Sequence, residues 1–159
     1  MALSPEELER YARHIVVPEV GGPGQAKLIN SKVLVIGAGG LGASALLYLA
    51  AAGVGTIGIC DNDTVSLSNL QRQVVHTTAR VGEYKTTSAR LTLEAINPHP
   101  NVIEHRLRLD TSNALDIIQG HPSWWRTHPT LRQLPKMTMP TFPCCRAGAG
   151  KSSAMLHST

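Results

Sequence analysis

The sequence predicts an α/β fold of the Rossmann-like, doubly wound kind, with a mainly parallel sheet. Two apolar, β-branched runs, residues 32–36 and 56–61, have the composition of strands that are buried on both faces. The Ala- and Leu-rich stretch 41–52 lies between them and is long enough for a helix. Strand, helix and strand in this order make one β-α-β unit, whose crossover we expect to be right-handed.

An N-terminal helical segment precedes this unit. Ser4 is a hydroxyl N-cap, a proline occupies the first helical position, and Glu7 completes a capping box. We therefore expect a helix through about Arg13. Residues 16–24 are rich in Gly and Pro and predict a loop, and residues 25–30 predict a short helical turn.

Three further elements follow the second strand. Residues 83–96 have apolar side chains at helical spacing and end at Asn97-Pro98, which predicts a helix. Residues 102–109 predict a third strand, and residues 113–119 a helix that ends at a glycine. The alternation of strands and helices favours a doubly wound sheet, truncated after about three strands.

The composition changes at residue 121. Residues 121–159 contain five of the ten prolines, both tryptophans and the one phenylalanine of the chain, and show no period of a strand or helix. We expect residues 1–120 to form an incomplete domain and residues 121–159 to form an irregular, disordered tail. That tail holds five basic and no acidic residues, whereas residues 1–120 hold ten Lys or Arg and eleven Asp or Glu. The net charge of +4 therefore gives the domain no reason to bind nucleic acid.

The three cysteines, Cys60, Cys144 and Cys145, have the spacing of neither a disulfide framework nor a zinc site. The N-terminus lacks the charged-then-apolar layout of a secretory signal, and no apolar run reaches the roughly 18 residues of a membrane span. We expect a cytoplasmic protein that has no contact with membranes.

The run Gly37-Ala38-Gly39-Gly40-Leu41-Gly42 fits G-x-G-x-x-G between a strand and a helix. Glycines permit a tight turn and a close approach of the backbone, and the helix N-terminus offers N–H groups to a phosphate. Asp61 ends the next strand at the distance expected for a ligand of a ribose hydroxyl. Together these features predict a nucleotide site.

The polar segment 61–73 discriminates between kinds of nucleotide site. A dinucleotide-binding domain has no need of Asn, Arg and Gln directly after its ribose acid, whereas Asn69 and Arg72 bring an amide and a guanidinium to the outer phosphates of a triphosphate. Lys85, on the following helix, adds a second cation. This segment favours adenylation over hydride transfer.

In these motifs the chain resembles the MoeB/ThiF-type adenylating enzymes, relatives of the ubiquitin-activating enzymes. The resemblance runs from about residue 3 to residue 120. It includes residues 10–15, the glycine loop, residues 49–55 and the segment 61–73.

The resemblance implies roles for individual residues. The catalytic set is Arg13, contributed by the partner subunit of a homodimer, with Arg72 and Lys85. The nucleotide-binding set is Gly37, Gly39, Gly40, Gly42, Asp61, Asp63, Ser68, Asn69, Leu70, Gln71, Arg72 and Lys85. No residue of this chain is expected to be a metal ligand.

The implied reaction is ATP- and Mg²⁺-dependent adenylation of the C-terminal carboxylate of a ubiquitin-like sulfur-carrier protein, as in molybdenum cofactor biosynthesis or tRNA thiolation. The family's later Asp-containing segment and its two Cys-x-x-Cys zinc pairs have no counterpart in this sequence. We therefore expect a truncated form with low or no activity. The alternatives are a fragment of an NAD(P)-dependent oxidoreductase and a non-catalytic nucleotide-binding or dimerisation module.

Overall fold

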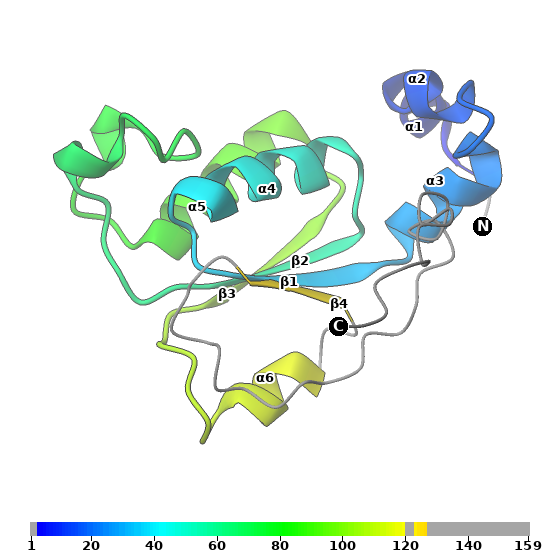
Figure 1. Cartoon of the computed structure of the whole chain (residues 1–159). Coiled ribbons are helices and arrows are strands. Elements are labelled where there is room, and N and C mark those ends of the chain that lie inside the picture. Colours follow the sequence, from blue (N-terminus) through cyan, green and yellow to red (C-terminus); the bar gives the residue numbers. More distant parts are fainter. Residues whose placement is uncertain (1–2, 120–122, 127–159) are drawn as a thin grey trace, which may run out of the picture.

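The computed structural model describes residues 3–119 and 123–126 of the 159-residue chain. Helices and strands alternate along the chain from the third helix onward, as Figure 1 shows. The elements are α1 (Pro5–Arg10), α2 (Ala12–Ile15), α3 (Gly21–Ile29), β1 (Lys32–Ile36), α4 (Gly40–Ala51), β2 (Thr56–Cys60), the 3-10 turns η1 (Leu67–Asn69) and η2 (Thr78–Arg80), α5 (Lys85–Ile96), β3 (Asn101–His105), α6 (Ala114–Gln119) and β4 (Ser123–Arg126).

The strands form one parallel sheet in the order β3-β2-β1-β4. Leu34 in β1 lies opposite Gly58 in β2 and opposite Trp124 in β4. The chain therefore builds the sheet outward from β1 in one direction through β2 and β3, and then returns to add β4 on the other side of β1.

The side chains of β1 point alternately into two cores, because successive residues of a strand face opposite sides of the sheet. Val35 packs with residues of α4 and α5, including Leu46 and Leu93. Leu34 packs on the other side with Ile118 of α6. Figure 1 shows α4 and α5 above the sheet and α6 below it. The prediction of a Rossmann-like, doubly wound fold is confirmed.

The sheet has one strand more than the sequence predicted. Residues 123–126, in the segment expected to be irregular, form β4 and pair in parallel with β1 from Val33 to Ile36. The prediction failed because a strand of four residues is too short to show a period. The pairing satisfies the backbone groups of β1 that would otherwise lie on an open edge. The expected tail lies outside the described residues from residue 127 onward.

The N-terminal segment also differs from its prediction. The capping box of Ser4 and Glu7 is present, but the helix is interrupted at Tyr11 and continues as α2. The expected loop 16–24 ends early, because α3 begins at Gly21 and runs through the Gly- and Pro-rich stretch. The proline of α3 lies in the first turn, where its missing N–H costs no helical hydrogen bond.

The N-terminal segment is attached to the C-terminal end of α4. The buried Tyr11 accepts a hydrogen bond of 2.8 Å from the Asn97 amide, which also donates to the carbonyl of Ala50 at 2.8 Å. Gln25, also buried, donates to the carbonyl of Ala52 and contacts His14. These polar contacts hold the N-terminal helices against the C-terminal ends of α4 and α5.

The third strand is shorter than predicted. It ends at His105, because the chain turns there and the N–H of Leu107 donates to the His105 carbonyl at 3.0 Å.

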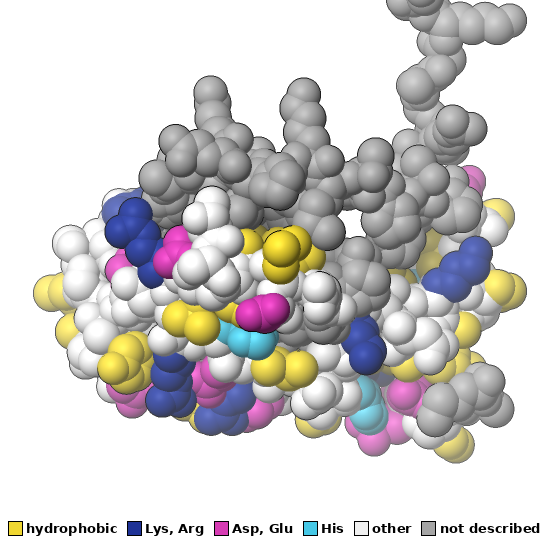
Figure 2. Space-filling view, turned by 90° about the horizontal axis from the view of Figure 1, so that it is seen from below, with side chains coloured by type: hydrophobic (Ala, Val, Ile, Leu, Met, Phe, Trp, Pro, Cys, Tyr) yellow, Lys and Arg dark blue, Asp and Glu magenta, His cyan; other side chains and the backbone are white. Residues whose placement is uncertain are grey.

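In the face seen in Figure 2, basic, acidic and apolar side chains are interspersed over the described surface. Within residues 3–119 and 123–126, no helix combines the length and the apolar character that crossing a membrane requires.

Candidate functional site

The glycine loop connects β1 to α4 at the carboxyl end of the sheet. Gly37 has a φ of 93°, which favours glycine, and its N–H donates to the Cys60 carbonyl at 2.8 Å. Gly39 is the N-cap residue of α4, and the first turn of this helix carries no acidic side chain. The helix therefore directs backbone N–H groups and the positive end of its dipole into the space beyond the loop.

Asp61 connects this loop to the segment that follows β2. One carboxylate oxygen, Oδ2, accepts the N–H of Ala38 at 2.7 Å, and the other, Oδ1, accepts the N–H of Asp63 at 2.8 Å. Each carboxylate oxygen has a second lone pair, so Asp61 can still accept hydrogen bonds from hydroxyl groups of a ligand. The same side chain thus fixes the loop and keeps acceptor capacity for a ligand.

The polar segment folds back over the glycine loop. The carbonyl of Asn69 accepts the N–H groups of Arg72 and Gln73, which closes a helical turn after η1. The side-chain carbons of Arg72 then lie 3.9 Å from the point that a Cβ on Gly40 would occupy. Arg72 is exposed, and its guanidinium donates to the Ser68 carbonyl at 3.3 Å. A cation therefore lies beside the N-terminus of α4.

Lys85 is the first residue of α5 and is buried. Its ammonium group donates to Asp63 at 2.8 Å, and its backbone N–H donates to the Asp63 carbonyl at 3.0 Å. An ammonium group carries three N–H bonds, so this ion pair uses one of them. The charge of Lys85 is held at the site by Asp63.

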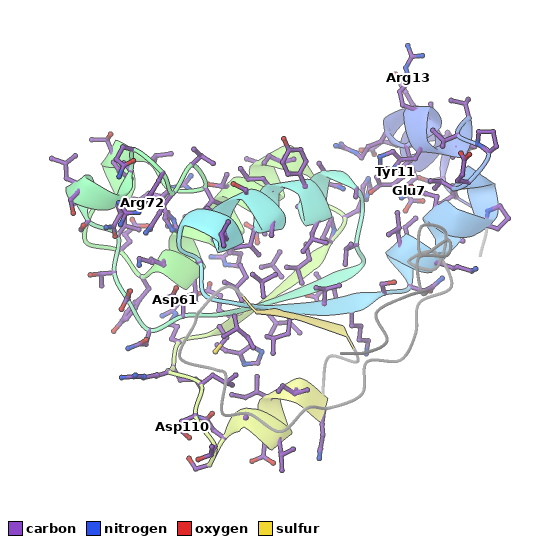
Figure 3. The ribbon with its side chains drawn as sticks, viewed as in Figure 1. Glu7, Tyr11, Arg13, Asp61, Arg72 and Asp110 are labelled. Atoms are coloured by element: carbon purple, nitrogen blue, oxygen red, sulfur yellow. The ribbon has the colours of Figure 1, made fainter. Side chains whose placement is uncertain are left out.

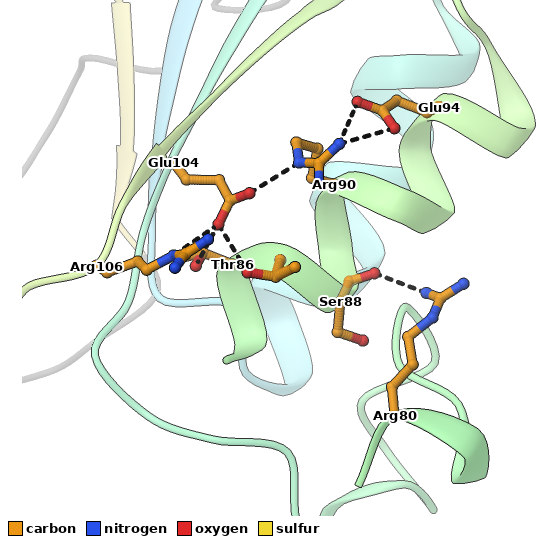
Figure 4. A network of polar contacts seen from close by, with 8 residues as sticks. Arg80, Thr86, Ser88, Arg90, Glu94, Glu104 and Arg106 are labelled. Atoms are coloured by element: carbon orange, nitrogen blue, oxygen red, sulfur yellow. Dashed lines mark hydrogen bonds and ion pairs between the residues drawn. The ribbon is translucent and has the colours of Figure 1, made fainter. Parts of the chain in front are cut away.

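The start of α5 is itself fixed by Glu104 of β3, at the centre of the polar network in Figure 4. Its carboxylate accepts hydrogen bonds from Arg90, Arg106, Thr86 and Thr87 at 2.7 to 3.0 Å. Partial burial opposes the ionised form, but these four donors outweigh it and lower the pKa of Glu104 from 4.5 to about 2.

Arg106 also lies over the ring of Tyr84, 5.3 Å from its centroid. Tyr84 is the N-cap residue of α5. Glu104 and Arg106 therefore hold the helix turn that carries Lys85, although neither is among the predicted site residues.

Other members of the predicted nucleotide-binding set lie in the same region with different surroundings. Gly42 is buried inside the first turns of α4. Ser68 is exposed, and its hydroxyl contacts that of Ser66 at 2.9 Å. Gln71 is exposed and Leu70 is partly buried. The structure thus brings together the glycine loop, Asp61, Asp63, the segment 68–72 and Lys85.

Arg13 lies apart from this group. It is exposed on α2, and Figure 3 shows it pointing away from the rest of the molecule, far from Asp61 and Arg72. Tyr11, two residues earlier, contacts Gly53 just after the C-terminal end of α4, whereas the glycine loop precedes its N-terminal end. A helix of 12 residues is about 18 Å long, so Arg13 does not reach the loop of its own chain.

Two buried residues next to the loop were missed. Gln73 is 5% exposed, lies near Gly39, and its Oε1 has no hydrogen-bond partner among the described residues. His76, also 5% exposed, contacts the Ala38 carbonyl at 3.0 Å. The sequence segment 61–73 includes Gln73, although Gln73 is not among the predicted site residues. For His76 the sequence holds no signal, because no spacing marks a single histidine as the neighbour of a loop 38 residues away.

The strand order places these groups where open α/β sheets bind ligands. The chain adds β2 and β3 on one side of β1 and β4 on the other side, so the strand order changes direction at β1. The glycine loop follows directly from the carboxyl end of β1. Ligands of doubly wound sheets bind in the crevice at such a switch point. The fold and the site therefore define a Rossmann-like nucleotide-binding domain.

The chain belongs to the ThiF family, whose model matches residues 11–123. It is 60% identical over 120 residues to the probable adenylyltransferase/sulfurtransferase MoeZ of Mycobacterium tuberculosis (strain CDC 1551 / Oshkosh), a match that covers 76% of this chain and 31% of MoeZ. It is 58% identical over 120 residues to the adenylyltransferase and sulfurtransferase UBA4 of Saccharomyces cerevisiae (strain RM11-1a), covering 75% of this chain and 27% of UBA4.

A solved structure of MccB from E. coli with ATP has a TM-score of 0.62 and 33% identity, and the match covers 68% of this chain and 33% of that protein. The chain thus spans about three tenths of the length of these relatives.

Proposed function

We propose that this chain binds ATP and adenylates the C-terminal carboxylate of a ubiquitin-like sulfur-carrier protein. The observation that carries the proposal is the position of Arg72, whose side-chain carbons lie beside the glycine loop at Gly40. Asp61 serves the ribose, the N-terminus of α4 serves a phosphate, and Arg72 and Lys85 provide positive charge for the phosphates beyond it. A mononucleotide triphosphate suits this arrangement.

The relatives support the choice of ATP and of adenylation. MoeZ and UBA4 are named as adenylyltransferases, and the MccB structure was determined with ATP. We infer the carrier protein from the family resemblance of the motifs, with molybdenum cofactor biosynthesis or tRNA thiolation as the pathway and the cytoplasm as the location.

In the proposed reaction, a carboxylate oxygen of the carrier attacks the α-phosphorus of ATP. An O–P bond forms, the bond from the α-phosphorus to the bridging oxygen breaks, and pyrophosphate leaves with the electron pair. The chain contributes alignment and charge neutralisation through Arg72 and Lys85, and through Arg13 of a second copy in a homodimer. No side-chain nucleophile takes part.

The family's metals, Mg²⁺ and zinc, need oxygen, nitrogen or sulfur ligands from several side chains or from phosphates. Within 3–119 and 123–126, no group of three or more His, Cys, Asp or Glu is placed to hold an ion. Mg²⁺ in nucleotide sites is bound largely by phosphates with one or two carboxylates, and Asp63, an exposed carboxylate of this region, already pairs with Lys85. These residues do not make a metal site, and we assign no step to Mg²⁺ or zinc.

The sequence contains no Cys-x-x-Cys pair, and we propose low or no turnover for the 159-residue chain when it is tested alone.

There are two alternative functions. An NAD(P)-dependent oxidoreductase would use the same glycine loop and Asp61 but not Arg72. A non-catalytic module would bind nucleotide or dimerise without transferring an adenylyl group.

The test is equilibrium titration of the full chain and of its Arg72→Ala variant with ATP, AMP and NAD. We expect the parent to bind ATP more tightly than NAD. We expect Arg72→Ala to weaken ATP binding by about tenfold to a hundredfold, the effect of losing a charged hydrogen bond. AMP binding should change little, because AMP lacks the outer phosphates.

The matched control is Lys32→Ala, which removes an exposed cation at the first residue of β1, at the opposite end of this strand from the glycine loop. This variant should bind all three nucleotides like the parent. Tighter binding of NAD than of ATP would favour the oxidoreductase, and equal losses of ATP and AMP affinity in Arg72→Ala would contradict the assigned role of Arg72.

A further inference from the structure

His76 occupies a buried position directly behind the glycine loop. Its Nε2 lies 3.0 Å from the carbonyl oxygen of Ala38, and its Nδ1 lies 3.0 Å from the hydroxyl of Ser88 on α5. His76 and Ser88 are both buried, at 5% and 0% exposure. The imidazole therefore connects the first helix after the polar segment to the backbone of the loop.

The chemistry of the two partners determines where the ring proton lies. A carbonyl oxygen only accepts hydrogen bonds, so Nε2 must carry the proton. In the neutral ring Nδ1 is then an acceptor, and the Ser88 hydroxyl must donate to it. The backbone carbonyl of Ser88 is held in turn by Arg80, at 2.7 Å. The contacts thus form a directed series from Ser88 through His76 to Ala38.

Ala38 is fully buried and is held from both sides. Its carbonyl accepts the hydrogen bond from His76 Nε2–H, and its N–H donates to Asp61 at 2.7 Å. It lies between Gly37 and Gly39, two residues that have little conformational preference of their own. The hydrogen bonds at Ala38 therefore decide which of the conformations open to these glycines the loop adopts.

The surroundings keep His76 neutral. Burial lowers the pKa of the ring, and the nearby cations Lys85 and Arg80 lower it further. The hydrogen bond to Ala38 and the carboxylate of Asp61 act in the opposite direction but are outweighed. Neutrality is what the donation from Ser88 to Nδ1 requires.

We propose that His76 is a positioning residue, which, as the Nε2–H tautomer, holds the glycine loop in the conformation that binds the nucleotide. This inference rests on the proposed function for its nucleotide part, whereas the tautomer and the hydrogen bonds do not depend on it. The two ring nitrogens of His76 are taken up by Ser88 and Ala38, so its effect on binding is exerted through Ala38.

The first test reads the tautomer directly. Long-range ¹H–¹⁵N correlation spectra of the full chain, labelled with ¹⁵N in its seven histidines, report which ring nitrogen carries the proton. The His76 signals are identified by their loss in the His76→Gln variant. We expect a protonated Nε2 and an unprotonated Nδ1 at neutral pH, and the opposite tautomer or a charged ring would overturn the proposal.

The second test compares two substitutions. His76→Leu leaves the Ala38 carbonyl without its donor, and we expect about a tenfold or greater loss of affinity for both ATP and AMP. His76→Gln keeps an N–H donor in reach of Ala38, so affinity should return to within about threefold of the parent. This recovery separates positioning of the loop from simple filling of the core.

The outcomes distinguish the two proposals. If His76→Leu binds ATP like the parent, or if His76→Gln is as weak as His76→Leu while both remain folded by circular dichroism, His76 does not position the loop. If His76→Leu does not fold, the tautomer and the His76→Gln affinity still decide. If the parent binds no nucleotide, the proposed function fails along with the nucleotide part of this inference, whereas the wrong tautomer with intact ATP binding overturns this inference alone.

Discussion

At the scale of single residues, Glu104 is a partly buried carboxylate that four side chains hold in place. It is 14% exposed in its side chain and accepts hydrogen bonds from two arginines and two threonines. Two of those donors, Thr86 and Thr87, lie in the first turn of α5 directly after Lys85. Arg90 has a second carboxylate partner, Glu94, whereas the hydroxyls of Thr86 and Thr87 both donate to Glu104, so removing the charge of Glu104 weakens their hydrogen bonds.

The depressed pKa of Glu104 predicts a dependence of stability on pH. Because the folded value of about 2 lies below the ordinary 4.5, the ionised form contributes stability that is fully present above about pH 4.5 and is lost as the pH falls toward 2. At neutral pH this contribution is on the order of 3 kcal/mol at most. We expect Glu104→Gln to be less stable than the parent in urea at neutral pH.

The difference between parent and Glu104→Gln should shrink as the pH approaches 2, because Glu104 is increasingly protonated as the pH nears its folded-state pKa. Glu9→Gln, at an exposed position of α1, is the control and should follow the parent at every pH. A difference of constant size from neutral pH down to pH 2 would show that the charge of Glu104 is not responsible.

At the scale of elements, the end of α4 and the N-terminal helices depend on each other through Gly53. The N–H of Gly53 donates to Ala50 and that of Val54 donates to Leu49, the two hydrogen bonds of a Schellman motif. Gly53 has a φ of 79°, and a Cβ there would lie 2.5 Å from the hydroxyl oxygen of Tyr11. The same glycine thus ends the helix and makes room for the tyrosine ring.

Three Gly→Ala variants separate these effects. Gly22→Ala places a methyl group in open space in a helix and should be neutral or stabilise by up to about 1 kcal/mol. Gly82→Ala meets a φ of 93° in open space and should cost roughly 1 to 2 kcal/mol. Gly53→Ala adds the clash with Tyr11 and should cost clearly more, measured by urea unfolding. A cost for Gly53→Ala equal to that for Gly82→Ala would show that Tyr11 moves aside freely.

At the scale of the whole molecule, the positions of Arg13 and the glycine loop at opposite ends of α4 bear on the proposed homodimer. Arg13 is exposed and unable to reach the loop of its own chain. If a second copy brings its Arg13 to the triphosphate, ATP affinity must depend on association of the two chains. A single chain would then hold only part of the charge that the triphosphate needs.

We expect Arg13→Ala to weaken ATP binding by about tenfold or more at protein concentrations where sedimentation shows a dimer, because a charged hydrogen bond is lost. At dilutions where the chain is a monomer, parent and variant should bind ATP equally. Lys32→Ala again serves as the control. Equal ATP affinity of parent and Arg13→Ala in the dimer would remove Arg13 from the site.

The sequence by itself determined those features of the protein that depend only on residues close together in the chain. The buried strand at residues 32–36, the capping box of Ser4 and the glycine loop are where the pattern placed them. Asp61 stands at the end of β2 and binds the loop. Each of these features is encoded within about a dozen residues, since strand periodicity, helix caps and turn residues act over short distances.

Tertiary structure alone decided the features that join distant segments. The four-residue strand β4 has no period of its own, yet its pairing with β1 creates the switch point beside the glycine loop. His76 reaches Ala38 across 38 residues, and Glu104 reaches Thr86 across 18. A histidine or a glutamate in a sequence has many possible partners, and only the packing of helices on the sheet selects one, because leaving a buried polar group unpaired costs free energy.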